Sequence, residues 1–196
     1  MIIIITGTPG TGKTSISTLV SGELECIHID VSQLVNQMKL GKNDPTGRQT
    51  LVLSSPQKVI QHIEEVHKKS KCIIIDTHYP SIFSSLARDV IAVFVLRTHP
   101  KTIIKRLARR GWIKNKVIEN AEAELIGVID NEAREQFDCV FSIDTTSKTV
   151  SETALLIKKL IDKIGQEPCL GQGRFIDWLD DESAIAAVLS IETGQS

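Results

Sequence analysis

A lysine and two hydroxyl residues end a run of small residues near the start of the chain, in the stretch GTPGTGKTS over residues 7–15. Residues 7–14 match the pattern G-x-x-x-x-G-K-[ST] and lie between an apolar run and a helical pattern, the context in which this motif binds phosphate. Glycines let backbone N–H groups close on phosphate oxygens, and Gly12 begins a helix whose positive end faces the same anion. Lys13 is then expected to contact the β- and γ-phosphates, and Thr14 to bind Mg²⁺. The alternative, an ordinary glycine-rich turn, leaves the complete pattern unexplained.

A carboxylate follows a second apolar run, in KCIIIDTHYP over residues 71–80. Ligands of open α/β sheets bind at the carboxyl ends of the strands, so Asp76 is expected to hold Mg²⁺, through water. His78 lies two residues further and points to the same side if the strand continues, where an imidazole can orient water or the reacting phosphate. The alternatives are a helix-capping or loop aspartate and a packed structural histidine.

A basic strip, RTHPKTIIKRLARRGWIKNK over residues 97–116, carries eight Lys or Arg residues and no acidic residue. Arg106 and Arg110 are four residues apart and share one face of a helix, whereas Arg109 points elsewhere. Such a strip suits a mobile lid over phosphates, because phosphoryl transfer depends on positioning and charge stabilisation. A solvated basic face or an RNA-facing patch is the alternative.

Apolar runs rich in Ile and Val alternate with helical patterns along the chain. The runs predict buried parallel strands at 2–6, 26–29, 71–76, 90–96 and 138–143. The helical patterns cover about 13–24, 32–40, 56–69, 80–88, 99–110, 115–135 and 149–164. This order indicates an α/β doubly wound fold with helices flanking the sheet.

Composition narrows the class of protein. The chain has 196 residues and a net charge of −1, which argues against a general electrostatic binder of nucleic acid. No apolar run approaches the roughly 18 residues of a membrane span. The four cysteines are far apart, which predicts buried reduced thiols rather than zinc ligands or disulfides, and a cytoplasmic setting (nuclear in a eukaryote). Their positions are Cys26, Cys72, Cys139 and Cys169.

The residues around the strand ends distinguish between P-loop classes. A GTPase carries Asp-x-x-Gly after the second motif strand, and here Tyr79 occupies the glycine position. The guanine motif Asn-Lys-x-Asp is also incomplete, since Ile118 stands where its aspartate would be. A nucleoside monophosphate kinase remains, with a P-loop near the start and a basic lid.

Three segments together resemble a known family: TGTPGTGKTS (6–15), IIIDTHYPS (73–81) with its Asp-x-His pattern, and VFVLRTHPKTIIKRLARRGW (93–112). The stretch 115–133 is also similar to the helix that follows the lid in that family. Over about residues 1–165 the chain resembles the adenylate-kinase-like P-loop NTPases of small ribosomal subunit maturation, which include human coilin-interacting nuclear ATPase and archaeal relatives.

The resemblance implies a five-stranded parallel sheet, an AMP-binding excursion at about 30–53 and a lid at about 109–119. It implies adenylate kinase activity (ATP and AMP to two ADP), a Mg²⁺-dependent ATPase activity, and association with a small-subunit ribosomal protein and pre-rRNA. By position, ATP would be bound by Gly10, Gly12, Lys13, Thr14, Ser15 and Arg110. Together with the residue-level argument, the expected catalytic set is Lys13, Asp76, His78 and Arg110.

The acceptor side departs from the family pattern. Asn36 stands where an arginine usually contacts the AMP phosphate, and Ser81 stands where adenylate kinases carry a second arginine. Lys39, Lys42 or Arg48 are possible substitutes. These losses leave three hypotheses open: an adenylate kinase, an ATP-driven assembly switch for a ribosomal protein with little kinase activity, and a nucleotide-binding factor without turnover.

Residues 166–196 lie outside the resemblance and form an acidic extension. They carry six acidic residues against Arg174 alone, a net charge of −5, so the rest of the chain carries +4. Asp180 or Asp181 is expected to cap a helix over about 182–191. Trp178 and several aliphatic residues favour packing on the chain's own domain. Docking near the basic lid, or on a basic ribosomal protein, is the alternative.

Overall fold

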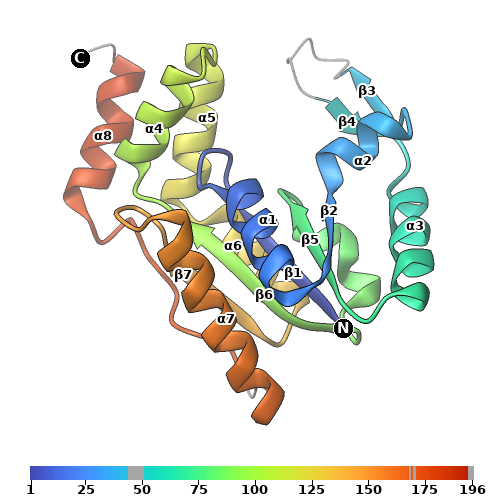
Figure 1. Ribbon diagram of the computed structural model, residues 1–196. Coiled ribbons are helices and arrows are strands. Elements are labelled where there is room, and N and C mark those ends of the chain that lie inside the picture. The colour runs from blue at the N-terminus through green and yellow to red at the C-terminus, as the bar shows by residue number, and fades with distance from the viewer. Residues whose placement is uncertain (44–50, 168, 170, 194–196) are drawn as a thin grey trace.

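The computed structural model describes residues 1–43, 51–167, 169 and 171–193 (Figure 1). Its centre is a sheet of five parallel strands in the order β2-β5-β1-β6-β7. The strands are β1 (Ile2–Gly7), β2 (Ile27–Asp30), β5 (Ile73–Thr77), β6 (Val90–Arg97) and β7 (Val140–Asp144). The predicted α/β fold with a five-stranded parallel sheet is confirmed.

Helices cover both faces of the sheet, which explains why β1 is apolar throughout. Ile3 and Ile5 pack on the face covered by α1 (Lys13–Leu24) and α7 (Val150–Gln166). Ile2 and Ile4 pack on the opposite face, among residues of α3 (Pro56–Lys69), the 3₁₀ helix η1 (Pro80–Leu86) and α6 (Val128–Gln136). All four isoleucines are fully buried.

Two groups of elements rise from the carboxyl edge of the sheet, on either side of the P-loop (Figure 1). One group contains α2 (Val31–Gln37) and the antiparallel pair β3 (Gly41–Asn43) and β4 (Leu51–Leu53). The other contains α4 (Pro100–Arg109), α5 (Lys114–Leu125) and α8 (Glu182–Thr193), which pack against one another. The described residues of the predicted AMP-binding excursion, 30–43 and 51–53, fall in or next to the first group, and its residues 44–50 lie outside the described part of the chain. The predicted lid at about 109–119 falls in the second group.

The helix predicted over 115–135 is wrong, because the chain breaks at Gly127 into α5 and α6. Gly127 has φ +68°, and a Cβ there would lie 3.0 Å from the Phe175 ring and 3.2 Å from Nη1 of Arg97. A residue with a side chain would meet both the left-handed backbone and these neighbours. The break turns α6 back onto the sheet, beside η1.

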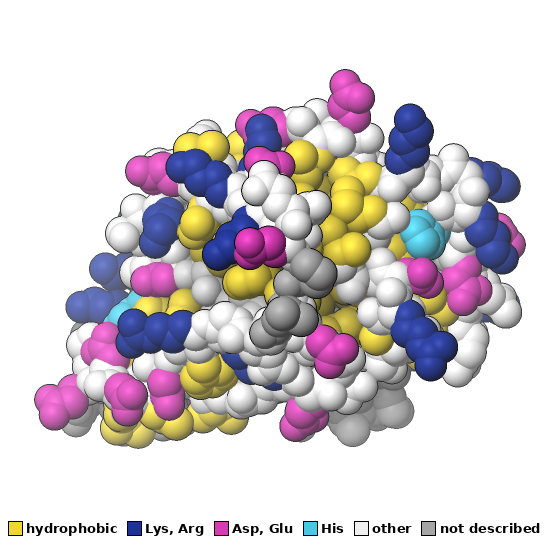
Figure 2. Space-filling view, turned by 90° about the horizontal axis from the view of Figure 1, so that it is seen from below, with side chains coloured by type: hydrophobic (Ala, Val, Ile, Leu, Met, Phe, Trp, Pro, Cys, Tyr) yellow, Lys and Arg dark blue, Asp and Glu magenta, His cyan; other side chains and the backbone are white. Residues whose placement is uncertain are grey.

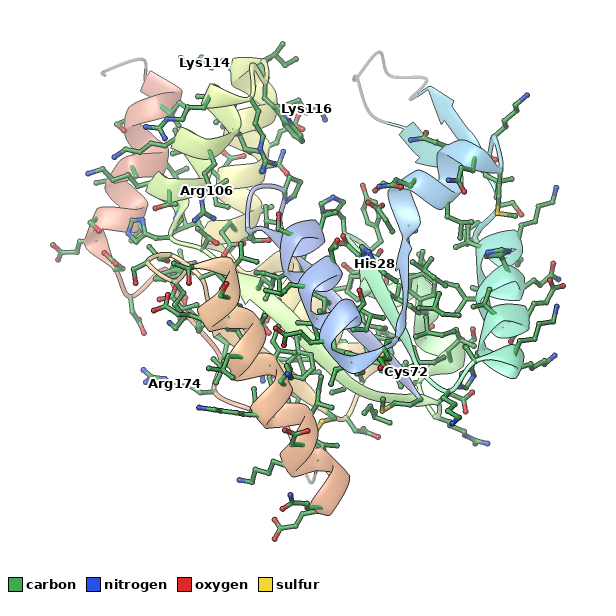
Figure 3. The ribbon with its side chains drawn as sticks, viewed as in Figure 1. His28, Cys72, Arg106, Lys114, Lys116 and Arg174 are labelled. Carbon is green, nitrogen blue, oxygen red and sulfur yellow. A yellow bond between two sulfur atoms is a disulfide. The ribbon has the colours of Figure 1, made fainter. Side chains whose placement is uncertain are left out.

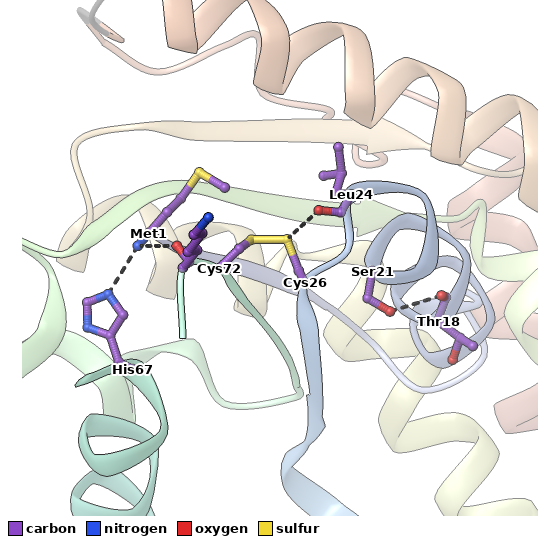
Figure 4. Close-up of a disulfide and its surroundings, with 8 residues drawn as sticks. Met1, Thr18, Ser21, Leu24, Cys26, His67 and Cys72 are labelled. Carbon is purple, nitrogen blue, oxygen red and sulfur yellow. Dashed lines mark hydrogen bonds between the residues drawn. A yellow bond between two sulfur atoms is a disulfide. The ribbon is translucent and has the colours of Figure 1, made fainter. Parts of the chain in front are cut away.

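The prediction of reduced cysteines is also wrong, since the structure contains the disulfides Cys26–Cys72 and Cys139–Cys169. Cys26 and Cys72 each directly precede a strand, and Ile27 pairs with Ile73 in the β2–β5 register. The register therefore places the two cysteines next to each other. Figure 4 shows this disulfide next to the amino group of Met1, which donates to the carbonyl oxygen of Lys71 at 3.2 Å. The argument from cysteines for a reducing compartment therefore no longer holds.

The surface opposite the P-loop edge carries mixed charge. Figure 2 shows Lys and Arg side chains interspersed with Asp and Glu on this face, with apolar atoms between them. Among the described residues, no helix has both the length and the apolar content needed to cross a membrane.

The acidic extension packs on the domain through its described residues. Gly173 donates its backbone N–H to the carbonyl oxygen of Val140 at 2.8 Å, beside β7. The Phe175 ring lies 5.6 Å from the guanidinium carbon of Arg97 and 5.4 Å from that of Arg134. The predicted helix is α8, and its cap is Asp181, whose carboxylate accepts from the N–H of Ser183 at 2.9 Å.

Candidate active site

The P-loop adopts the conformation that a phosphate cradle needs. Gly10 and Gly12 have φ +96° and +95°, which L side chains rarely adopt, and these turns let successive N–H groups face inward. Gly7 lies so close to β6 that a Cβ would be 2.4 Å from the carbonyl oxygen of Leu96. Thr11 closes the loop by donating from N and Oγ1 to the carbonyl oxygen of Thr8, at 3.2 and 2.9 Å.

A cavity of about 160 Å³ opens over this loop, and we call it the phosphate cavity. It brings together residues from the P-loop, from the end of β5 and from the turn after α4. Its lining includes Gly10, Gly12, Lys13, Thr14, Ser15, His78, Arg110 and Trp112. Most of the predicted ATP-binding residues therefore face one space.

Lys13 is held under this cavity. Its Nζ donates to the carbonyl oxygen of Thr8 at 3.2 Å, and its side chain is only 5% exposed. Burial lowers the pKa of Lys13 to about 7, against the opposing charges of Asp76 and Glu124. A phosphate beside Nζ adds negative charge and favours the protonated form, so the lysine is suited to an anionic ligand.

Asp76 has the properties of a metal-holding carboxylate. It is the next-to-last residue of β5 and is 4% exposed, and its Oδ2 is buried without a hydrogen-bond partner among the described residues. Burial raises its pKa, but contacts from His28 and Thr14 and the charge of Lys13 outweigh burial and lower it. The carboxylate is therefore ionised and has an unused oxygen.

A magnesium ion would fit these donors. The described part of the chain has no group of three or more His, Cys, Asp or Glu placed to hold a metal by itself. Mg²⁺ typically keeps several waters and takes one or two protein oxygens besides phosphate oxygens. Asp76 and the exposed Thr14 hydroxyl would supply these. His28 Nε2, which is also buried and has no hydrogen-bond partner in the described part of the chain, lies 3.8 Å from Asp76 Oδ2, so a water can serve both atoms.

His78 is a neutral imidazole with one free acceptor atom. Its Nδ1 lies 3.2 Å from the carbonyl oxygen of Gly7, and because a carbonyl only accepts, Nδ1 carries the hydrogen. Burial and the neighbouring charge of Lys13 lower the pKa of His78 to about 4. Nε2 is then unprotonated at neutral pH and can accept a proton or a hydrogen bond.

Arg106 and Arg109 lie on α4 and Arg110 directly follows it, and only Arg106 and Arg110 face the P-loop side. Arg106 donates from Nη1 to the carbonyl oxygen of Gly10 at 2.9 Å, and Arg110 lines the phosphate cavity. Both line a further cavity of about 120 Å³ on the side of α7, with Lys148 and Thr149. Arg109 is exposed and lines neither cavity. Figure 3 shows Arg106 on α4 at one side of the P-loop and His28 on β2 at the other.

A larger cavity of about 380 Å³ adjoins the phosphate cavity, and we call it the aromatic cavity. It is lined by Tyr79 and Trp112, together with Lys116 and Asn120 of α5. Pro9, His78 and Trp112 line both cavities and so form their shared wall. The sequence analysis identified neither Trp112 nor Tyr79. Their exposed fractions of 39% and 55%, unusual for aromatic rings, become evident only in the structure.

The residues considered for binding the acceptor phosphate lie in different surroundings. Asn36 and Lys39 are exposed on and after α2, and the side chains of Lys42 and Arg48 lie outside the described residues. Ser81 donates from Oγ to a carboxylate oxygen of Glu132, which lines the aromatic cavity. The Ser81 hydroxyl is therefore bonded to a carboxylate and carries no positive charge toward the cavity.

Beneath the loop lies a buried ion-pair network that sequence analysis missed. Arg97, 1% exposed, donates from Nε to Glu124 Oε1 at 2.8 Å and from Nη1 to Asp130 Oδ2 at 3.2 Å. Glu124 Oε2 accepts from Thr8 Oγ1 at 2.6 Å. Glu124 thus joins the end of β6 to the P-loop. Its position in a mixed polar helix gave no signal that it is buried.

Comparisons with known proteins identify the family of the chain. A family model described as an AAA domain matches residues 3–127, which include the P-loop, Asp76, His78 and Arg110. A Saccharolobus solfataricus protein named "Putative adenylate kinase" is 38% identical over 182 residues, covering 92% of this chain and 89% of its own length. The chain belongs to the adenylate-kinase-like P-loop NTPases.

A second relative and two solved structures are also similar to this chain. A Methanosarcina acetivorans protein, also named "Putative adenylate kinase", is 36% identical to this adenylate-kinase-like NTPase. The match covers 92% of this chain and 98% of the length of that protein. Shikimate kinase from Acinetobacter baumannii superposes with a TM-score of 0.62 at 15% identity, covering 83% of this chain and 93% of that one. Deoxyadenosine kinase from M. mycoides gives 0.57 at 17% identity, covering 84% and 100%. At these identities the two structures support the kinase-like fold alone.

Proposed function

We propose that this nucleotide-binding protein is an adenylate kinase that converts ATP and AMP into two ADP, with an accompanying Mg²⁺-dependent ATPase activity. The observation that carries the proposal is the wall shared by the two cavities, made of Pro9, His78 and Trp112. A phosphoryl group held in the phosphate cavity would face an acceptor held in the aromatic cavity across this wall.

The donor side follows from the residues of the phosphate cavity. ATP would place its β- and γ-phosphates on the P-loop N–H groups and Lys13, with Arg110 above them. In the transfer, an AMP phosphate oxygen bonds to the γ-phosphorus while the bond to the β–γ bridging oxygen breaks, and ADP leaves. Lys13 and Arg110 would stabilise the charge spread over the transferred group. Asp76 and Thr14 would hold Mg²⁺, which would neutralise further charge on the phosphates.

The acceptor side is proposed from the aromatic cavity. Tyr79 offers a half-exposed ring on which an adenine can stack, and Lys116 and Asn120 offer donors to phosphate or ribose oxygens. Neutral His78 would accept a hydrogen bond at Nε2 from the attacking group or, without AMP, from a water. Because arginines are missing at 36 and 81, we expect AMP to be a mediocre acceptor.

A second candidate function has one observation in its favour. Ser81 donates to Glu132 and Asn36 is a neutral, exposed amide, so neither supplies the positive charge of the arginine expected at its position. An ATP-driven assembly switch with little kinase activity would need only the donor side. Its partner, a small-subunit ribosomal protein with or without pre-rRNA, is proposed from the family resemblance alone.

ATP turnover measured with and without AMP, and again with ribosomal protein and rRNA, separates the two functions. Tyr79→Ala tests the acceptor pocket, and Tyr79→Phe is its matched control because the ring remains. We expect the KM for AMP to rise roughly tenfold in Tyr79→Ala, as the loss of one stacked base predicts. The KM for ATP should stay unchanged. Equal AMP kinetics in all three proteins would contradict an acceptor in this cavity.

A further inference from the structure

The carboxylate of Glu124 lies between the P-loop and the C-terminal segment. Glu124 is 1% exposed and makes contacts through both of its carboxylate oxygens. Oε2 accepts from Thr8 Oγ1 at 2.6 Å, and Oε1 accepts from the indole Nε1–H of Trp178 at 3.1 Å. The two neighbours are 170 residues apart in the sequence and meet through this one side chain.

On the P-loop side, the contact continues to the phosphate-binding lysine. The carbonyl oxygen of Thr8 accepts from Lys13 Nζ at 3.2 Å and from the N–H of Thr11 at 3.2 Å. Thr8 therefore links Glu124 to Lys13: its hydroxyl bonds Glu124 and its carbonyl oxygen bonds Lys13. A shift of the Glu124 carboxylate would move the residue that holds Lys13.

On the other side, the C-terminal segment is anchored at several points. Arg97 Nη1 donates to the carbonyl oxygen of Ile176 at 2.8 Å, two residues before Trp178. The His99 ring lies 5.4 Å from the Trp178 ring, and its Nε2 is 3.4 Å from Asp181 Oδ2. Trp178 itself is 9% exposed. The position of its indole is thus also fixed by contacts other than the hydrogen bond to Glu124.

The helix that follows Trp178 packs on the helices of the basic strip. α8 contacts α4 and α5, and Ile191 joins the apolar cluster of Ile103, Leu107 and Val117. α4 also carries Arg106, which bonds the P-loop at Gly10. The C-terminal segment thus touches both supports of the phosphate site, the loop through Glu124 and the arginine helix through α8.

We propose that Trp178 and Glu124 are positioning residues of the nucleotide site: Trp178 fixes the Glu124 carboxylate, which fixes the P-loop through Thr8. Burying a carboxylate and an indole N–H is costly unless they are paired, and apolar residues of similar size often give equal or greater stability. The buried polar link is therefore better explained by the position it imposes on Thr8 than by stability. Arg97 and the N–H of Thr98 hold the same oxygen from the strand side.

A double-mutant cycle on ATP affinity tests this link. Trp178→Phe removes the indole N–H and keeps a ring, and Thr8→Val removes the hydroxyl and keeps the shape. Leu179→Ala is the matched control, since Leu179 adjoins Trp178 and is 49% exposed. Binding of a fluorescent ATP analogue is measured for each protein. This readout needs no AMP, so a failure of the adenylate kinase proposal leaves it unaffected.

We expect each single variant to bind the analogue about threefold to tenfold more weakly, the range that follows from the net contribution of one typical hydrogen bond. Leu179→Ala should bind the analogue normally. Both changes break the same link. The double variant should therefore lose little more affinity for the analogue than the weaker-binding single variant has already lost. Losses that multiply, or normal binding by Trp178→Phe, would overturn the proposal.

Hydrogen exchange of the nucleotide-free protein separates positioning from general destabilisation. In Trp178→Phe we expect faster exchange in the peptide over residues 7–15, with the peptides of β5 and β6 unchanged. A uniform rise in every peptide would mean that Trp178 only stabilises the fold, and unchanged exchange over 7–15 would mean that the indole does not reach the P-loop. Either result contradicts the positioning role.

Discussion

His78 Nδ1 lies 3.2 Å from the carbonyl oxygen of Gly7, so a side chain at the end of β5 is hydrogen-bonded to the first residue of the P-loop. This bond fixes the tautomer of the imidazole, and His78 lines both the phosphate cavity and the aromatic cavity. It also ties the strand that carries Asp76 to the loop that carries Lys13. The bond therefore links the two segments that carry the proposed metal-binding carboxylate and the proposed phosphate-binding lysine.

Replacing His78 with Ala should affect turnover more than binding. Loss of a positioned general base or hydrogen-bond acceptor typically costs about 10²-fold to 10⁴-fold in rate. We expect kcat to fall by at least about 10²-fold, while the ATP dissociation constant changes by less than about threefold. Steady-state kinetics and equilibrium ATP binding measure the two quantities. Equal losses in both would assign His78 a structural role only.

Lys13→Ala should abolish ATP turnover and leave the fold intact. The ammonium is buried at a cost in desolvation, so its removal takes away a phosphate contact without removing core packing. We expect a loss of about 10²-fold or more in kcat/KM with an unchanged thermal unfolding midpoint. Lys158→Ala is the control, because Lys158 forms an ion pair with Glu23 on α1, away from the phosphate cavity. Full activity in folded Lys13→Ala protein would refute the P-loop assignment.

Substituting Asp76 by Asn should weaken the response to Mg²⁺ specifically. The amide keeps the shape of the side chain but removes the negative charge that a divalent cation requires. The Mg²⁺ concentration for half-maximal turnover should rise by about tenfold or more. A titration of Mg²⁺ at saturating ATP measures it. An unchanged midpoint would show that Asp76 does not serve the metal.

Arg110→Ala should lower kcat by more than it raises the KM for ATP. Arg110 is exposed at the end of α4, so its strongest contacts with phosphate would form on closure of the lid. We expect kcat to fall by about 10-fold to 10²-fold with a KM change below about threefold. Arg109→Ala is the matched control and should behave like the unaltered protein. A rise in KM alone would mean that Arg110 contacts only ground-state ATP.

The sheet and the P-loop could be predicted from the sequence because their signals are local. A parallel strand buried on both faces reads as an unbroken apolar run, as in Ile2–Ile5. The glycine and lysine spacing at 7–14 is set by the phosphate itself. Asp76 and His78 follow from the rule that sites lie at the carboxyl ends of parallel strands.

The remaining features depend on contacts between distant segments. Glu124 is paired with Thr8 and Trp178, and nothing in its own helix separates it from a solvated glutamate. The disulfide of Cys26 and Cys72 follows from the β2–β5 register, which strand patterns alone do not fix. Gly127 breaks a helix that is continuous by periodicity because it adopts φ +68°, and Arg97 and Phe175 leave little room there for a side chain.

The products formed from ATP and AMP test the central claim most directly. ³¹P NMR of a reaction with equal ATP, AMP and Mg²⁺ follows all phosphates at once. The account predicts that ATP and AMP disappear together, that two ADP form for each AMP consumed, and that inorganic phosphate accumulates more slowly. Release of inorganic phosphate and ADP with AMP untouched would contradict the adenylate kinase assignment and leave the protein an ATPase.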